Sequence, residues 1–193
     1  MGQQTRRTFL LPASVALAAV LPASETPEYL AAQKKIDLIR QGAVPAGSAV
    51  ILKKAELNAY VAREVRLVAP EGVRNPRLEL GNNFASAFAH VDFAKLQRSQ
   101  GQTPGWLVET LLTGERPVRV DARIRSGKGR AVVDVEQVVI SGVAISGSAL
   151  DYLIRNFLWA YYPEAKVGKP FELAHRIDRL EVSPAEVKVV IAR

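Results

Sequence analysis

The chain has 193 residues, of which 48% are hydrophobic, and it contains two histidines and no cysteine. The lack of cysteine excludes disulfides, thiol catalysis and zinc sites built on thiolates. The formal net charge is +7, from 26 basic and 19 acidic residues. One domain is expected at this length. His90 and His175 lie far apart in the sequence, without the spacing of metal ligands.

Residues 1–24 have the layout of a secretory signal. Arg6 and Arg7 precede an apolar run from Phe9 to Leu21, which is short for a membrane span and is interrupted by Pro12. The two arginines also resemble a twin-arginine export motif, so that route and the general secretory route both stay open. We expect export to the periplasm or another extracytoplasmic site, with signal cleavage favoured over retention as a membrane anchor.

The charge of the exported part indicates its partners. Without residues 1–24, 24 basic residues remain against 19 acidic ones. A moderate basic excess outside the cytoplasm favours contact with anionic lipid or cell-wall polymer over contact with nucleic acid.

The first expected helix ends near Arg40. Thr26 is a hydroxyl cap, Pro27 suits the first helical position, and Glu28 faces the positive end of the helix dipole. Three helix-breaking residues follow the helix, namely Gly42, Pro45 and Gly47. Residues 25–47 are therefore expected to form an N-terminal helix and linker, which acts as a linker or a lid rather than as part of the core.

Residues 48–193 are expected to form one domain, which begins with a short strand over Ala49–Leu52. The helix that follows, over residues 53–65, has an apolar face made of Leu57, Tyr60, Val61 and Val65. A hairpin comes next, from Arg77–Leu80 to Phe84–Phe93 through a Gly-Asn-Asn turn.

The strand over Phe84–Phe93 lacks a strongly polar face. Strict alternation places two sets of side chains on opposite faces, Phe84, Ser86, Phe88 and His90 against Ala85, Ala87, Ala89 and Val91. We therefore expect both faces of this strand to be covered. The segment Trp106–Gly114 then predicts a short helix that ends at Gly114. Its inward-facing side chains are expected to be Leu107, Leu111 and Leu112.

The clearest hairpin spans residues 116–140. Its first strand alternates apolar with charged residues, Val118, Val120, Ala122 and Ile124 against Arg119, Asp121, Arg123 and Arg125. This alternation is typical of a half-buried strand. A turn over Ser126–Gly129 leads to a return strand that carries Asp134 and Glu136 against inward Ala131, Val133, Val135 and Val139.

An amphipathic helix is expected over residues 148–161. Its apolar residues recur at spacings of three and four, at Leu150, Leu153, Ile154, Phe157, Leu158 and Tyr161. Asp151 and Arg155 form a pair four residues apart on its polar side. Tyr152 and Trp159 lie off the main stripe, so the apolar arc of this helix is unusually wide.

A last hairpin closes the chain over residues 176–192. It turns at Ser183-Pro184 and carries an alternating apolar row of Val187, Val189 and Ile191. Hairpins interrupted by helices indicate the α+β class. We expect a curved antiparallel β-sheet, a meander of hairpins, wrapped around or packed on amphipathic helices.

The sequence carries no motif for catalysis. We find no catalytic carboxylate pair, serine elbow, phosphate-binding glycine loop or calcium loop. Gly127-Lys128-Gly129 is a turn, too short for a phosphate loop. We therefore expect a protein that is not an enzyme and uses neither a cofactor nor a metal.

The order of elements over residues 48–193 has a recognisable pattern. A short strand precedes AELNAYV on a helix, and a hairpin, an amphipathic LDYLIRNF helix and a closing PFELAHRIDRLEVSPAEVKV segment follow. This order resembles that of the small secreted YpmS-like and LmeA-like proteins, which are similar to the tubular lipid-binding superfamily. The resemblance implies a long curved antiparallel sheet that wraps a helix and holds lipid in an apolar groove. This chain departs from the pattern in having Lys53-Lys54 in place of a Ser/Thr helix cap and no proline at Gly142–Ile145.

Two candidate sites follow from these patterns. A groove between sheet and helix would admit an acyl chain and be lined by Phe84, Phe88, Leu150, Leu153, Ile154, Phe157, Leu158 and Tyr161. The same apolar stripe is also explained by an ordinary core. A basic hairpin face would meet an anionic surface through Arg119, Arg123, Arg125, Lys128 and Arg130.

The predicted function is non-catalytic binding of a lipid, a fatty acid or another apolar ligand in this groove, at an anionic membrane surface. The alternative is an envelope structural or interaction module that docks its aromatic helix on a protein partner. Binding of an anionic polymer through the basic hairpin is a third hypothesis.

Overall fold

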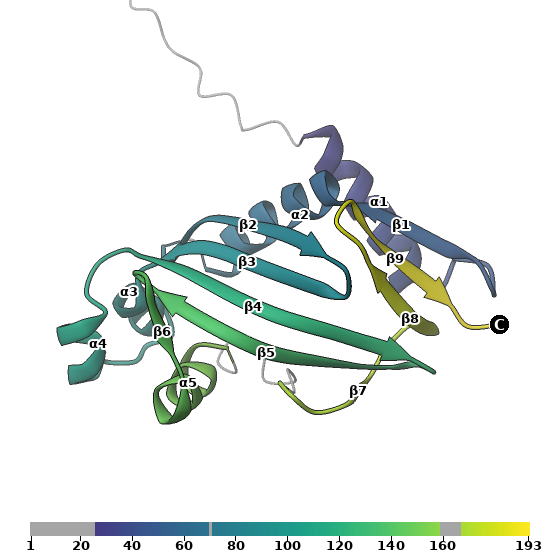
Figure 1. Ribbon diagram of the computed structural model, residues 1–193. Coiled ribbons are helices and arrows are strands. Elements are labelled where there is room, and N and C mark those ends of the chain that lie inside the picture. The colour runs from purple at the N-terminus through teal and green to yellow at the C-terminus, as the bar shows by residue number, and fades with distance from the viewer. Residues whose placement is uncertain (1–25, 70, 159–166) are drawn as a thin grey trace, which may run out of the picture.

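The fold is α+β, as the sequence predicts, and it contains two antiparallel sheets in place of a single one (Figure 1). The computed structural model describes residues 26–69, 71–158 and 167–193. The predicted signal over residues 1–24 and the end of the predicted aromatic helix, with Trp159 and Tyr161, lie outside the described residues.

The larger sheet has six strands, five of them in the order β2-β3-β4-β5-β6, and β7 pairs with β5 beside this path. Every pairing in this sheet is antiparallel. Its strands are β2 (Val73–Gly81), β3 (Phe84–Val91), β4 (Arg116–Gly127), β5 (Arg130–Ile140), β6 (Val143–Ile145) and β7 (Phe171–Glu172).

The smaller sheet joins the two ends of the domain. Its strands are β1 (Ala49–Lys53), β9 (Glu186–Ile191) and β8 (Ile177–Val182), in the order β1-β9-β8. The predicted β8–β9 hairpin is confirmed, whereas the pairing of β1 with β9 does not follow from neighbouring hairpins. The two sheets are tied by Ser126, whose hydroxyl donates to the Leu180 carbonyl and accepts from the Leu180 N–H, both at 2.8 Å.

The helices of the described residues are α1 (Pro27–Arg40), α2 (Lys54–Val68), α3 (Phe93–Ser99), α4 (Trp106–Leu111), α5 (Gly147–Leu153) and a π-helical turn η1 (Ile154–Leu158). The predicted bounds of α1 are confirmed, and the Thr26 hydroxyl accepts from the Tyr29 N–H at 3.3 Å. Within the described residues, no helix has both the length and the apolar character that a membrane crossing requires.

The N-terminal segment belongs to the folded core. Ile39 of α1 and Val44 of the following loop are buried against Leu52 of β1 and Val189 of β9. The linker and lid interpretations of this segment are therefore wrong, because its apolar side chains complete the core of the smaller sheet.

An acidic residue caps α2, where the sequence lacks a Ser or Thr cap. The Glu56 carboxylate accepts the N–H of Lys53 at 2.9 Å and pairs with Lys35 Nζ of α1 at 2.7 Å. Burial opposes ionisation of Glu56, but the hydrogen bonds from Lys35 and Lys53 outweigh it and hold the pKa below its ordinary value of 4.5. The same carboxylate therefore starts α2 and attaches it to α1.

The strand predicted over Phe84–Phe93 ends two residues early. Asp92 caps α3, which the sequence patterns did not predict, by accepting the Lys95 N–H at 3.0 Å. Phe93 is consequently the first residue of a helix and is buried in the core.

The first strand of this hairpin begins earlier than predicted, at Val73. A β-bulge between Arg74 and Arg77 absorbs Pro76, which cannot donate a ladder hydrogen bond, and Asn75, which has φ 49°. The bulge therefore lets the strand continue through Pro76.

A second bulge, at Glu136, changes the alternation in β5. One extra residue lies in β5 at this point relative to β4, so the residues beyond it exchange faces. Val138 and Ile140 are buried, at 7% and 5% exposure. The prediction that Val139 points inward is wrong for this reason.

The predicted helix over 148–161 is not a continuous α-helix in its described part. It begins as α5 and widens into the π-helical turn η1, in which more residues complete each turn than in an α-helix. Arg155 Nε donates to the carbonyl oxygen of Asp151 at 3.2 Å, in place of the predicted contact between the two side chains.

Candidate functional site

The inner face of the larger sheet carries an apolar surface with small residues at its centre. Ala87 of β3 pairs with Leu78 of β2 on one side and with Val120 of β4 on the other, and Ala89 pairs with Val118. Directly paired residues share a face, so these side chains point the same way. Because alanine side chains are short, they leave space above the middle of the sheet.

Helix α2 is held over this face by the side chain of Asn58, which forms the two backbone hydrogen bonds that a neighbouring strand would form. Asn58 Oδ1 accepts the N–H of Leu78 at 2.7 Å, and Asn58 Nδ2 donates to the carbonyl oxygen of Leu78 at 3.0 Å. Both backbone groups of Leu78 at the edge of β2 are thereby satisfied. The edge of the sheet and α2 are fixed to each other at this point.

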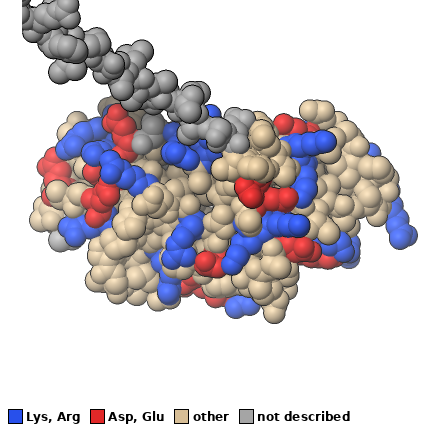
Figure 2. All heavy atoms as spheres, turned by 90° about the horizontal axis from the view of Figure 1, so that it is seen from above, with Lys and Arg blue, Asp and Glu red and all other residues tan. Residues whose placement is uncertain are grey.

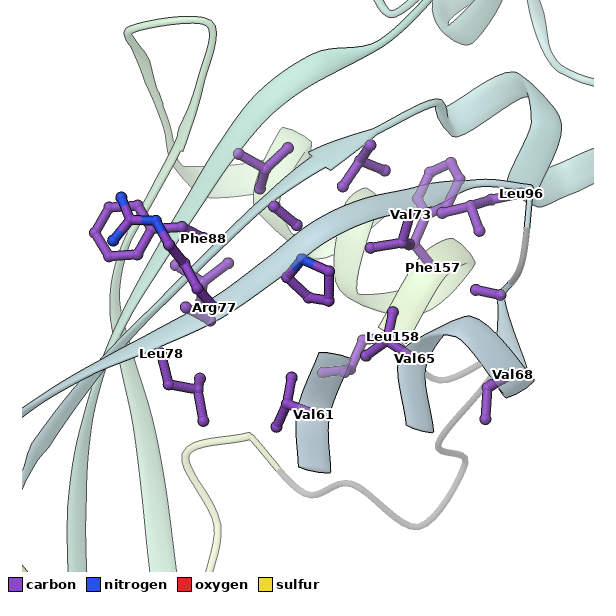
Figure 3. A pocket seen from close by; sticks show the side chains of 17 residues that line it. Val61, Val65, Val68, Val73, Arg77, Leu78, Phe88, Leu96, Phe157 and Leu158 are labelled. Atoms are coloured by element: carbon purple, nitrogen blue, oxygen red, sulfur yellow. The ribbon is translucent and has the colours of Figure 1, made fainter. Parts of the chain in front are cut away.

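An apolar pocket of about 290 Å³ lies between α2 and the sheet, and we call it the α2 pocket. Figure 3 shows side chains of α2, of the strands and of η1 around this space. Its volume is at the lower end of the range of about 300–1,000 Å³ usual for small-ligand pockets. The lining consists of Val61, Val65, Val68, Ala69, Val73, Pro76, Arg77, Leu78, Ala87, Phe88, Ala89, Val91, Leu96, Val118, Val120, Phe157 and Leu158.

The η1 turn contributes Phe157 and Leu158 to the lining of the α2 pocket. The Phe157 ring packs edge-on against Phe93 of α3, with ring centroids 4.9 Å apart. Tyr152, which the sequence pattern placed off the apolar stripe, packs against the same ring at 6.4 Å. Aromatic packing therefore holds Phe157 in place at the wall of the pocket.

The predicted groove residues are only partly brought together. Phe157 and Leu158 line the α2 pocket, as does Phe88, whereas Leu153 lines a second pocket described below. Leu150 packs against the core of the larger sheet, and Ile154 is half-buried without lining either pocket. Tyr161 lies outside the described residues.

The two phenylalanines of β3 belong to the outer face of the sheet. Phe84 pairs with Arg123 and Phe88 with Arg119, so both share the face that carries the arginines. Phe88 borders the α2 pocket at its margin, where the guanidinium carbon of Arg77 lies 3.9 Å from the ring centroid (Figure 3). Phe84 is not part of the pocket lining.

Sequence reasoning missed the helical wall of the α2 pocket. Val61, Val65 and Val68 of α2 supply that wall, together with Ala69. The apolar face predicted for this helix contained Val61 and Val65, but the sequence did not show which sheet face it would cover.

A second apolar pocket, of about 340 Å³, is formed by β6, α5 and residues near the end of β5. We call it the α5 pocket. It shares no lining residue with the α2 pocket and is lined by Leu112, Arg116, Ile140, Ser141, Val143, Ile145, Ala149, Tyr152 and Leu153.

The arginines of the β4–β5 hairpin are matched by carboxylates. The ion pairs are Arg119–Asp121 at 3.0 Å, Arg123–Glu136 at 2.6 Å and Arg125–Asp134 at 2.6 Å. Arg130 lies opposite Glu172 of β7, and Lys128 is exposed at the turn. On the face shown in Figure 2, basic and acidic side chains are likewise interspersed. Four of the five predicted anionic-surface residues, all except Lys128, therefore lie beside acids and do not form a block of one sign.

Comparison with protein-family models, with curated proteins and with solved structures gives no match to this chain. Among the described residues, no group of three or more His, Asp or Glu side chains is arranged to hold a metal ion.

Proposed function

We propose that the protein binds a lipid or another ligand with an alkyl chain in the α2 pocket. The observation that carries the proposal is the chemistry of the lining, in which apolar side chains of α2, of three strands and of η1 surround one space. Away from Arg77 at the margin, a polar or charged ligand would lose its hydration there without gaining hydrogen bonds from side chains. An alkyl chain gains from the same surroundings, because it leaves water and contacts apolar atoms.

The construction of the pocket supports binding over incomplete packing. Side chains in a protein core usually leave few voids larger than a water molecule. Here the space persists beside two alanines and beneath a helix that Asn58 anchors to the sheet edge at 2.7 and 3.0 Å. The walls are therefore fixed by hydrogen bonds that do not depend on filling the space.

The place of action is part of the same proposal. The pattern of residues 1–24 supports export from the cytoplasm. The exported protein would then have access to envelope lipids. The paired arginines of the β4–β5 hairpin give less support to a strong electrostatic attraction to membranes, since exposed ion pairs leave little net charge.

The test is a comparison of thermal stabilisation by dodecanol in the wild type and in Ala87→Leu. The larger side chain fills the α2 pocket from the sheet side. Dodecanol should raise the melting temperature of the wild type in a concentration-dependent manner, because a ligand of the folded state stabilises it. The shift should be much smaller in Ala87→Leu.

A matched control is Val132→Leu, which also introduces a leucine but on the outer face of the sheet, where Val132 pairs with Arg125. It should retain the wild-type shift. Equal shifts in the wild type and in Ala87→Leu would refute binding in the α2 pocket.

A further inference from the structure

The α5 pocket contains one charged side chain among apolar walls. Arg116 is the first residue of β4 and pairs with Val91 of β3, two positions before Val118 pairs with Ala89. Arg116 therefore lies on the inner, apolar face of the sheet, whereas Arg119, Arg123 and Arg125 lie on the outer face. It lines the α5 pocket together with Ile140, Val143, Ile145 and Leu153.

Arg119, Arg123 and Arg125 each have an ion pair, whereas the guanidinium of Arg116 has none among the described residues. Its Nε is buried and has no hydrogen-bond partner among the described residues. The neighbouring acid, Glu115, is engaged with Arg74 at 3.0 Å. An arginine stays charged at any physiological pH, so a buried Nε–H without an acceptor is unfavourable. This donor calls for an acceptor that the described residues do not supply.

The rest of the pocket defines what kind of molecule brings the acceptor. Apart from Arg116, Ser141 and Tyr152, the lining consists of leucine, isoleucine, valine and alanine, which offer a free inorganic anion no hydrogen bonds. Val143, at the border of the pocket, is 62% exposed, so apolar surface continues outward to solvent. In Figure 1 the elements β6 and α5 that form the pocket lie together at one end of the larger sheet.

We propose that the α5 pocket binds an amphiphile by its anionic head, a carboxylate or phosphate paired with Arg116, with the alkyl chain against the apolar walls. A guanidinium matches the geometry of both acids and forms charge-assisted hydrogen bonds to them. Since the two pockets share no lining residue, this site is separate from the α2 pocket and can exist without it.

The test uses three probes below their aggregation concentrations: dodecanoate, dodecanol and inorganic phosphate. Calorimetry on the whole chain should show that dodecanoate binds about tenfold or more tightly than dodecanol, as a charge-assisted pair requires. Arg116→Met keeps the length and apolar character of the stem and should remove that preference. Arg116→Lys should retain part of it.

Three more variants locate the effect. Arg125→Met removes an exposed arginine that is paired with Asp134 and should leave the preference for dodecanoate intact. Ala149→Phe fills the α5 pocket and should abolish the preference, while Ala87→Leu, which fills only the α2 pocket, should preserve it.

Three results would overturn the proposal. These are equal affinity of the wild type for dodecanoate and dodecanol, an unchanged preference in Arg116→Met, and binding of inorganic phosphate as tight as that of dodecanoate. Loss of dodecanol binding in Ala87→Leu concerns the α2 pocket alone, so failure of the proposed function and failure of this inference are distinguishable.

Discussion

The two sheets differ in how their side chains use the space beside them. The smaller sheet, with α1, forms a compact core of Ile39, Val44, Leu52, Val189 and Ile191, each at most 9% exposed. On the larger sheet, the inner face borders both apolar pockets, and many of its valines remain half-buried.

This difference follows from residue size and from what holds the helices. Around the smaller sheet, branched side chains pack against one another, and the partly buried Lys35–Glu56 pair attaches α1 to the start of α2. On the larger sheet, alanines occupy the centre of β3, and Asn58 holds α2 by backbone hydrogen bonds at the sheet edge. A helix fixed by its polar contacts does not collapse onto small residues. One half of the molecule therefore stabilises the fold and the other half keeps space for a ligand.

The largest expected effect is a truncation in the compact half. Ile191→Ala should lower the free energy of unfolding by about 2–5 kcal/mol, because Ile191 is only 3% exposed and belongs to the compact core of the smaller sheet. Leu78→Ala, at the border of the α2 pocket, should cost clearly less. Urea unfolding of both variants measures the difference, and equal losses would contradict the contrast between the halves.

Removal of the Asn58 anchor should have the next largest effect. Asn58→Ala leaves the N–H and carbonyl of Leu78 without their partner, which should cost about 1–3 kcal/mol. Hydrogen exchange at the Leu78 amide should accelerate beyond the change in global stability. Asn58→Asp keeps the acceptor and should protect this amide better than Asn58→Ala; identical exchange in the two variants would argue against the anchor.

Enlarging an alanine should also affect the stability of the two halves differently. Ala32 of α1 is fully buried, so Ala32→Leu should destabilise the protein by about 1–3 kcal/mol. Ala87→Leu adds the same atoms next to an existing space and should cost less than about 1 kcal/mol. If unfolding experiments gave the reverse order, the pocket would not be a stable feature in solution.

Acidification should weaken the attachment of α1 to α2. Glu56 has a lowered pKa in the folded state, so its stabilising contribution is complete above its ordinary value of 4.5 and is lost as pH falls through the folded pKa. Glu56→Gln should therefore show a shallower loss of stability on the acid side than the wild type does. Parallel stability–pH curves for the two proteins would contradict this role.

The sequence predicted the parts of this fold that depend on local chemistry. Thr26 and Pro27 predicted the start of α1, and the alternation after Arg116 predicted β4. The errors arise where tertiary pairing decides. The bulge at Glu136 reverses the faces of β5, and the pairing of β1 with β9 joins residues more than a hundred positions apart.

The candidate site was predicted less completely for the same reason. Phe157 and Leu158 were found, because an apolar stripe at helical spacing is visible in sequence. The α2 wall was missed, since nothing local states which sheet face Val61 and Val65 cover. Phe84 was assigned to the groove because its strand has two apolar faces, and only the register with Arg123 places it outside.

The most direct test is to determine whether the protein carries an alkyl-chain ligand. The protein is purified without detergent from the exported fraction, and an organic extract is analysed by mass spectrometry, for the wild type and for Ala87→Leu in parallel. We predict an amphiphile in near-stoichiometric amount with the wild type and clearly less with Ala87→Leu. Equal amounts in the two extracts, or none in either after incubation of the proteins with envelope lipids, would contradict the proposal that the α2 pocket is a lipid-binding site.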